Sequence, residues 1–379
     1  MIENNPFHFK LENVKPLAGF VAENIGPGQV GKVLARGFVN SDQKEFYEYT
    51  NQISSLFLGQ RYLIDTIHTF LILIHPDLSA DVYVNLVPIE LRILAKGNLK
   101  PGNVSIRQIA DVEALEFDGI DVLEKDSIIF CFKKGWKFGL FFDFNQILGQ
   151  KSMDLQALQE ELGSYYKYLM FQEEYAVLEN EAMFSRMFQD GWFPFIQLLG
   201  GEFKELARIY EGGTNLDSDI GTFITRFDRS RLDSFVQHWW RNEIFRQKEP
   251  IIMSGIEAYL MNNQAGFINA IKTLYSEIEG IIRITYTKET GKNPSFQELI
   301  DYINQKARVK FGSRISLGFP GVFFDYIREH IFKSFDLASG QVDLSRHSAS
   351  HGVAEAKDYT KNKALQAVLV LDQMSFYLT

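Results

Sequence analysis

The chain has 379 residues, of which 46% are hydrophobic and 23% are charged, and its formal net charge at pH 7 is −9. This composition is that of a folded protein and excludes a disordered chain. The negative charge argues against a protein that coats nucleic acid through bulk electrostatics, so we expect no bulk DNA binding. The length accommodates two domains.

The sequence does not indicate export or membrane insertion. Residues 1–6 lack the basic segment and apolar core of a secretory signal, and the longest apolar run, 63–74, is too short to cross a bilayer. Cys131 is the only cysteine, so no intramolecular disulfide can form. We therefore expect a cytoplasmic protein of bacterial type with no membrane contact.

The first part of the chain combines helical and strand patterns. Residues 1–40 are rich in glycine with a short strand pattern over 7–14, and apolar residues recur at helical spacing over 42–74. Alternating apolar residues predict strands between 82 and 93, and alternation on both sides of a polar turn predicts a β-hairpin over 127–145. We therefore predict an α+β domain over residues 1–148, whose role the sequence does not indicate.

Helical patterns dominate after a short linker at residues 149–153. A helix pair is predicted over 256–286, with a break at Asn262 to Gln264. Apolar stripes predict further helices, over 155–169, 232–247, 296–307, 322–335 and 362–377. We therefore predict a mostly α-helical domain over residues 153–379.

A glycine-rich string, Gly26-Pro-Gly-Gln-Val-Gly31-Lys32, partly matches phosphate-binding loops. The complete pattern requires Ser or Thr after the lysine to hold Mg²⁺, and Val33 stands there instead. Gly37 also interrupts the helix whose N-terminus would meet the phosphate. We interpret the string as a loop, and a nucleotide-driven switch is the weaker alternative.

Three basic clusters suit either RNA contact or an ordinary solvated surface. The first, Lys133 to Lys137, includes Trp136, the second contains Arg226, Arg229 and Arg231, and the third spans 306–314. Cations beside an aromatic ring can bind RNA by charge and stacking. Charge runs of this density more often form a solvated face, which is the interpretation we prefer.

The densest concentration of reactive side chains is Leu344-Ser-Arg-His-Ser-Ala-Ser-His351-Gly352. Cleavage of RNA through its own 2′-hydroxyl requires a group that moves protons near neutral pH and a cation that stabilises the phosphate. His351 and Arg346 supply these two functions without a metal or cofactor. On a regular helix, five steps place the two side chains about 140° apart. We therefore expect the motif at a helix end, with Gly352 terminating the helix.

Two other interpretations of this stretch stay open. His347 and His351 have a spacing that can hold zinc, but two histidines are too few for a normal zinc shell, and Ser348 stands where a metalloprotease has Glu. Alternatively, the arginine and histidines only satisfy a buried acid and backbone carbonyls. Glu279 lies in an apolar stretch, where a semi-buried carboxylate needs a cationic or a hydrogen-bonding partner, and our hypothesis is that it pairs with Arg346.

The stretch from Arg346 to His351 resembles the motif of the HEPN superfamily (higher eukaryotes and prokaryotes nucleotide-binding), and the flanking Leu344-Ser345 and Gly352 are similar to a bacterial subset. A helix that ends at Ile278-Glu-Gly280, together with the segments 358–359 and 364–378, extends the resemblance over roughly residues 230–379. It implies a C-terminal helical bundle that often forms a homodimer, with two copies of the motif at one cleft.

The resemblance also implies a reaction. Many relatives are metal-independent endoribonucleases of toxin or antiviral defence systems, and others are non-catalytic binding modules. By this resemblance His351 transfers protons, Arg346 binds the phosphate, His347 replaces the common Asn and orients or assists, and Glu279 is a supporting acid. We therefore expect a homodimeric endoribonuclease that uses no cofactor or metal; the alternative is a non-catalytic interaction or ligand-sensing dimer.

Overall fold

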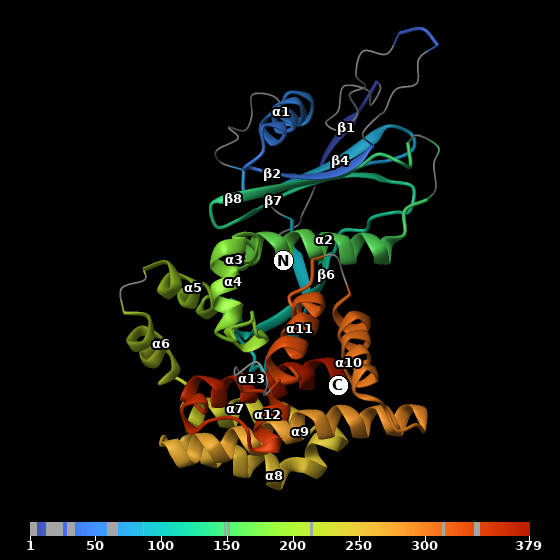
Figure 1. Cartoon of the computed structure of the whole chain (residues 1–379). Helices are drawn as coiled ribbons and strands as arrows, with labels where there is room; N and C mark the ends of the chain where they lie inside the picture. Colours follow the sequence, from blue (N-terminus) through green and yellow to red (C-terminus); the bar gives the residue numbers. More distant parts are fainter. Residues whose placement is uncertain are drawn as a thin grey trace. The chain divides into compact units, whose positions relative to one another are not determined.

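A computed structural model describes residues 6–12, 26–28, 35–58, 67–85, 87–147, 149, 152–212, 215–312, 315–336 and 342–379 (Figure 1). The chain forms two compact units. The first comprises Met1–Ile93 and Val112–Met170, and the second comprises Leu94–Asp111 and Phe171–Thr379. Sheet structure is concentrated in the first unit, and the second is mostly helical.

The first unit is built on an antiparallel six-stranded sheet with the order β1-β4-β3-β7-β8-β2. Its strands are β1 (Phe7–Lys10), β2 (Arg36–Asn40), β3 (Thr69–Ile74), β4 (Ser79–Val84), β7 (Ser127–Lys134) and β8 (Lys137–Asp143). The predicted hairpin is confirmed, because β7 and β8 pair up to Lys134 opposite Lys137. Gly135, in the left-handed region at φ 61°, allows the tight turn between them.

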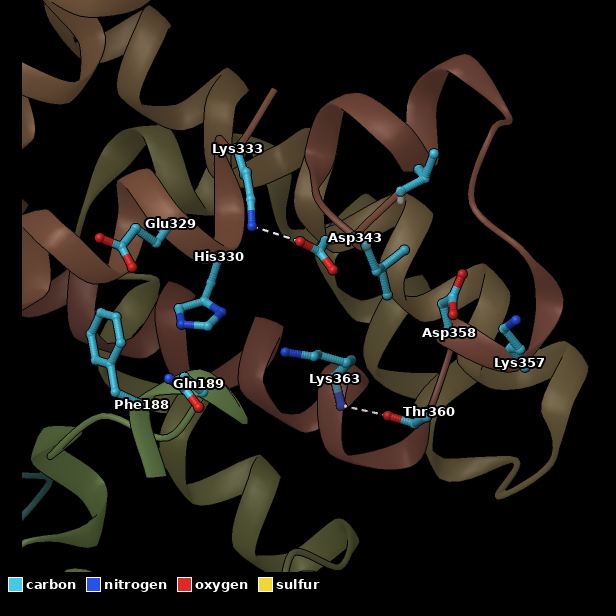
Figure 2. Close-up of a pocket in the computed structure, with 12 residues that line it drawn as sticks. Phe188, Gln189, Glu329, His330, Lys333, Asp343, Lys357, Asp358, Thr360 and Lys363 are labelled. Atoms are coloured by element: carbon cyan, nitrogen blue, oxygen red, sulfur yellow. Dashed lines mark hydrogen bonds and ion pairs between the residues drawn. The ribbon is translucent and has the colours of Figure 1, made fainter. Parts of the chain in front are cut away.

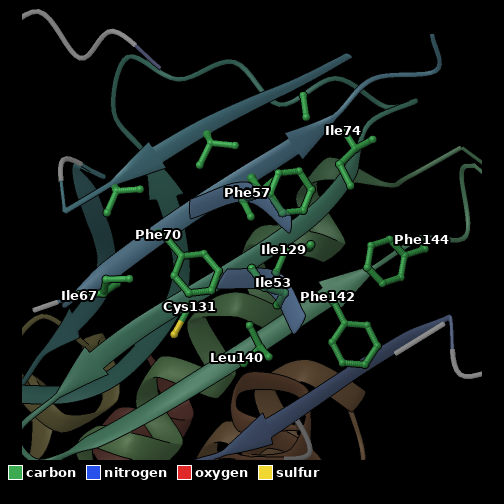
Figure 3. Close-up of a cluster of buried hydrophobic side chains, with 14 of the residues drawn as sticks. Ile53, Phe57, Ile67, Phe70, Ile74, Ile129, Cys131, Leu140, Phe142 and Phe144 are labelled. Carbon is green, nitrogen blue, oxygen red and sulfur yellow. The ribbon is translucent and has the colours of Figure 1, made fainter. Parts of the chain in front are cut away.

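Side chains alternate between the two faces of this sheet, and each face carries its own core. Helix α1 (Lys44–Ile53) packs on one face, where Ile53 and the following Phe57 meet Phe70, Ile129 and other apolar side chains (Figure 3). Helix α2 (Leu155–Met170) packs on the other face, where Leu158 and Leu162 join a second cluster. A central strand covered on both faces must be apolar throughout.

This double burial explains why the helical prediction over 42–74 is only partly right. The prediction is confirmed for α1 but wrong for residues 69–74, which form strand β3. Residues Phe70 to Ile74 are all buried, so their sequence, Phe-Leu-Ile-Leu-Ile, has no alternation of polar and apolar residues. A short continuous apolar run of this kind does not distinguish a strand from a helix.

The predicted strands near residues 82–93 are confirmed as β4 and β5 (Ile89–Ala95), and β5 pairs with β6 (Ile109–Phe117). The segment between these two strands belongs to the second unit. There Lys96 Nζ donates a hydrogen bond to the Leu199 carbonyl at 2.7 Å, and Arg241 donates to Asn98 at 2.7 Å. The compact units therefore differ from a simple division of the chain at residues 148–153.

The second unit is a set of packed helices. They are α3 (Gln172–Glu179), α4 (Glu181–Gln189), α5 (Glu202–Gly212), α6 (Leu216–Ile224), α7 (Arg229–Trp239), α8 (Glu243–Leu260), α9 (Gln264–Thr290), α10 (Phe296–Phe311), α11 (Pro320–Tyr326) with its π-helical extension η6 (Ile327–Ile331), α12 (Arg346–His351) and α13 (Lys361–Leu378). Short 3₁₀ turns occur at η4 (Ile106–Gln108), η5 (Ile196–Leu198) and η8 (Ala356–Asp358), and a π-helical turn, η1 (Ser54–Leu58), follows α1 in the first unit. Helix α13 is central, with buried residues from Ala364 to Tyr377.

The predicted break between α8 and α9 is confirmed. Asn262 has a left-handed backbone, and the Asn263 side chain accepts a hydrogen bond from Gly266 N at 2.8 Å, which caps α9. Two other boundaries are wrong. The helix predicted over 232–247 is divided into α7 and α8, and α9 continues past Gly280 to Thr290, because a single glycine does not end a helix that packs along its length. Among the described helices, none is both long and apolar enough to span a bilayer.

A histidine in the first unit is held between two carboxylates. His75 Nδ1 lies 2.8 Å from Asp126 Oδ1, and its Nε2 lies 3.4 Å from Asp81 Oδ2. Burial opposes protonation of His75, but the hydrogen bonds and charges of Asp126 and Asp81 outweigh it and raise the pKa.

A raised pKa in the folded state predicts a defined pH dependence of stability. His75 contributes its full stabilisation below the unfolded pKa of about 6.5, and this contribution is lost as pH rises through the higher folded pKa. The substitution His75→Gln should therefore lower the free energy of unfolding at pH 6 more than at pH 8, as measured by urea denaturation. His68→Gln, at an exposed side chain, is the matched control. An equal loss at both pH values would contradict the prediction.

Candidate functional site

The predicted motif forms a complete short helix, α12, whose two ends are fixed by the local sequence. At its N-terminus Ser345 and Ser348 cap each other: Ser348 N donates to Ser345 Oγ at 3.2 Å, and Ser345 N donates to Ser348 Oγ at 2.8 Å. At its C-terminus Gly352 adopts φ 71°, a left-handed conformation that glycine tolerates best. The prediction that Gly352 terminates the helix is confirmed.

Helix α12 packs against α9 and is held there by an ion pair. Arg346 Nε lies 2.5 Å from Glu279 Oε2, so the predicted pairing of these residues is present. The two atoms attract by charge and do not have the geometry of a directed hydrogen bond. Glu279 is buried, and its other oxygen accepts a hydrogen bond from Arg283 Nη2 at 2.9 Å. One carboxylate therefore balances two guanidinium groups.

The ion pair occupies only one part of the Arg346 guanidinium. Within the described part of the chain, its Nη1 and Nη2 atoms make no hydrogen bond, and the side chain is 27% exposed. A guanidinium presents several donors in a fixed planar arrangement that suits phosphate oxygens. Arg346 is thus anchored at Nε and retains donors for an anionic group.

The two histidines of α12 have different surroundings. The His347 ring lies edge-on to Phe296, with ring centroids 4.8 Å apart. Burial and the Arg346 charge lower the pKa of His347, and the charge of Glu279 only partly opposes them. The lowered pKa favours the neutral imidazole at pH 7. His351 is exposed at the C-terminal end of the helix, and its ring lies 5.6 Å from that of Phe335. The His351 ring is therefore open to solvent or to a bound molecule.

Arg346 and His351 face different neighbours within one chain. Because α12 is helical from the first residue to the second, their side chains diverge by about 140°. Arg346 is held against α9, whereas His351 is exposed beside Phe335. A reaction that uses both groups on one phosphate therefore requires a second copy of the motif or a rearrangement of α12.

The basic clusters noted in the sequence are largely paired with acids or rings. Arg226, Arg229 and Arg231 each form a two-pronged contact with a carboxylate, of Glu205, Glu257 and Glu202 respectively. In the hairpin, Lys133 and Lys134 lie over aromatic rings, and Lys137 pairs with Asp42 at 2.5 Å. In the third cluster Lys306 pairs with Glu289 at 2.7 Å. Trp136, at 94% exposure, is the unburied ring of the first cluster.

The structure bears on one of the two weaker alternatives, the metal site, and the nucleotide-binding loop stays a prediction. Among the described residues, no group of three or more His, Cys, Asp or Glu side chains is arranged to hold a metal ion. In the glycine-rich string, Gly31 and Lys32 lie outside the described residues.

The sequence interpretation missed a polar cavity that is lined by residues before and after α12 in the chain. His330, Lys333, Asp343 and Lys363 are among its lining residues. One signal was available: Lys363 lies in the first turn of α13, where the helix dipole disfavours a cation. Nothing in the sequence relates His330 and Lys333, which are three residues apart, to Lys363, which lies 30 residues after Lys333.

The Glu279–Arg346 contact predicts a measurable cost of neutralising the acid. Glu279→Gln removes the charge that balances Arg346 and Arg283, and it should lower the free energy of unfolding by about 1–3 kcal/mol in urea denaturation. Glu289→Gln on the same helix breaks a more exposed pair with Lys306, keeps an amide oxygen that can accept from Tyr302, and should change the free energy of unfolding by less than about 0.5 kcal/mol. Equal effects would mean that the buried pair is no stronger than a surface one.

Comparisons of the chain with protein-family models, with curated proteins and with solved structures found no match in any of the three cases. The HEPN resemblance therefore rests on the motif residues and their helical surroundings. The site itself is defined by four residues on two helices: Glu279 on α9, and Arg346, His347 and His351 on α12.

Proposed function

We propose that the protein is a metal-independent endoribonuclease of toxin or defence type, in which Arg346 and His351 assist attack of an RNA 2′-hydroxyl on the adjacent phosphate. One observation carries the proposal: Arg346 is anchored by Glu279 through Nε while its Nη atoms keep unused donors. An arginine that served only to neutralise a buried acid would gain from using these donors as well. The arrangement fits a guanidinium positioned for a phosphate.

Each residue has a role that matches its surroundings. Arg346 stabilises the charge that builds on the phosphate oxygens. His351 is exposed and takes or returns the proton of the reacting hydroxyl. His347, whose pKa is lowered, is neutral at pH 7 and can accept a hydrogen bond or a proton next to Arg346. Glu279 is a positioning residue that acts through Arg346.

A homodimer is part of this proposal. Because Arg346 and His351 of one α12 face different neighbours, a complete site combines Arg346 of one copy with His351 of the other. HEPN-like helical domains commonly dimerise around this motif, and residues 230–379 supply the dimer surface in our proposal. Residues 1–148 then serve as a sensor or specificity module.

The alternative is a non-catalytic interaction or ligand-sensing dimer with the same helices. The burial of Glu279 favours it, since a buried acid needs a cation whether or not catalysis occurs. In that case α12 is a structural part of the dimer surface. The two functions differ in whether RNA is cut.

RNA cleavage by the purified full-length protein in EDTA tests the reaction. The substitution His351→Ala should slow cleavage at least about 100-fold, because the proton-transfer group is removed. Ser350→Ala, at an exposed neighbour on the same helix, should leave the rate unchanged. The products should end in a 2′,3′-cyclic phosphate. Absence of cleavage by the wild type, or equal rates for wild type and His351→Ala, would favour the non-catalytic dimer.

Mixing two inactive variants tests the shared site. Arg346→Ala and His351→Ala should each be inactive alone, and a mixed dimer should recover part of the activity, because one of its two sites then holds both intact residues. The measurement is the cleavage rate after co-refolding or subunit exchange. Mixed dimers that form but remain inactive would place both residues of a site on one chain.

A further inference from the structure

A polar cavity of about 540 Å³ lies in the second unit, beside the start of α13. This size is within the range of small-molecule sites, roughly 300–1,000 Å³. Its walls come from α4, η6, the residues before α12 and the first turn of α13 (Figure 2). Figure 2 shows His330, Lys333 and Lys363 directed toward the centre from different sides.

Most charged groups on the cavity wall already have partners. Lys333 Nζ lies 2.6 Å from Asp343 Oδ2, and Lys357 pairs with Glu355 at 2.7 Å. The remaining carboxylates are also engaged: Glu329 lies 3.4 Å from Arg328, and Asp358 accepts a hydrogen bond from Glu355 N at 2.9 Å. Each charged side chain of the lining therefore has an ion pair or a hydrogen bond, with the exception of one cation.

That cation is Lys363. Within the described residues its Nζ forms no ion pair or hydrogen bond. Burial lowers its pKa, and the more distant charges of Asp190 and Asp343 only partly oppose this effect. Burying a charged lysine without an anionic partner costs free energy, and binding of an anion lowers this cost. Lys363 therefore indicates a site for negative charge.

His330 provides a second unpartnered group in the same cavity. Its Nε2 is inaccessible to solvent and has no hydrogen-bond partner. Burial and the nearby Lys363 charge lower its pKa to about 3, so the ring is neutral. A hydrogen bond from the ring to the Phe188 backbone favours protonation, which means that the other nitrogen carries the proton and Nε2 is an acceptor. The neutral ring therefore adds no positive charge to the cavity, and Lys363 and Lys333 are its cations nearest to the ring.

We propose that this cavity binds a small phosphate monoester. Lys363 and Lys333 contact the phosphate oxygens, and the neutral His330 ring forms part of the wall beside them. Two lysines that approach from different sides match the two negative charges of a phosphate monoester better than the single charge of a carboxylate. The rest of the cavity, flanked by Phe188, accommodates the organic part of the ligand.

The site is separate from the groups proposed for RNA cleavage. Arg346, His347 and His351 do not line the cavity. Asp343 is the nearest link, because it pairs with Lys333 and its carbonyl accepts a hydrogen bond from Ser348 of α12 at 2.8 Å. Phosphate binding and RNA cleavage can therefore be tested, and can fail, independently.

Isothermal titration calorimetry on the full-length protein in a phosphate-free buffer tests the proposal. The probes are glycerol 3-phosphate, inorganic phosphate and uncharged glycerol. We expect the phosphates to bind and glycerol not to bind. The substitution Lys363→Gln should weaken binding at least about tenfold, because a charge-assisted hydrogen bond is lost. Lys361→Gln, two residues earlier on α13 and outside the cavity lining, is the matched control.

The outcomes distinguish an organic phosphate from free phosphate as the ligand, and they also show whether the cavity binds phosphate at all. Tighter binding of glycerol 3-phosphate than of inorganic phosphate would identify an organic phosphate as the ligand class, and equal binding would mean that free phosphate is sufficient. If Lys363→Gln does not fold, Lys333→Gln at an exposed position should show the same loss. Absence of phosphate binding by the wild type, or equal affinity for wild type, Lys363→Gln and Lys333→Gln, would overturn the proposal.

Discussion

The second unit depends on the burial of α13 on all sides. Residues from Ala364 to Tyr377 are buried, and the helix packs against α9, α10, α7 and α8. A helix buried all round cannot rely on an apolar stripe alone, so its polar side chains must find partners inside the core. Asp372 accepts a hydrogen bond from Trp239 Nε1 at 2.8 Å, and Gln373 accepts one from Ile196 N at 2.9 Å. These contacts fix how the surrounding segments meet the helix.

The chemistry of the candidate site follows from this framework. Helix α12 has six residues, too few to be stable alone, and it persists because its serines cap it, Gly352 ends it, and α9 holds Arg346 through Glu279. The same framework sets the first turn of α13 beside η6, which brings Lys363 and His330 to one cavity. The two proposed sites thus share a scaffold but use different residues.

Arg346 and Lys363 differ from the other basic residues in how much of their charge is already engaged by partners. Arg231 is held by both oxygens of Glu202, so little of its charge is free to attract RNA. Arg346 has one ion pair, at Nε, and the Nζ atom of Lys363 has no ion pair or hydrogen bond within the described chain. In an acidic protein, cations with unused donors are more informative than the number of basic residues.

Local sequence determined much of the fold and the boundaries of the motif. Serine at 345, glycine at 352 and the alternation around Gly135 act on neighbouring residues, so α12 and the β7–β8 hairpin were predictable. Strand β3 was not, because a strand buried on both faces loses the period of two that identifies it. The pairing of Glu279 with Arg346 could be expected from the need of a buried acid for a cation.

Only the tertiary structure decided which charges remain available. Arg229 and Glu257 are far apart along the chain, as are His330 and Lys363, and no periodicity in the sequence relates them. Their contacts arise when helices pack, and packing distributes partners among groups that look alike in the sequence. The sequence by itself therefore determined a helical second half with an Arg-to-His helix, whereas folding decided that Arg346 is anchored, His351 is exposed and Lys363 faces an open cavity.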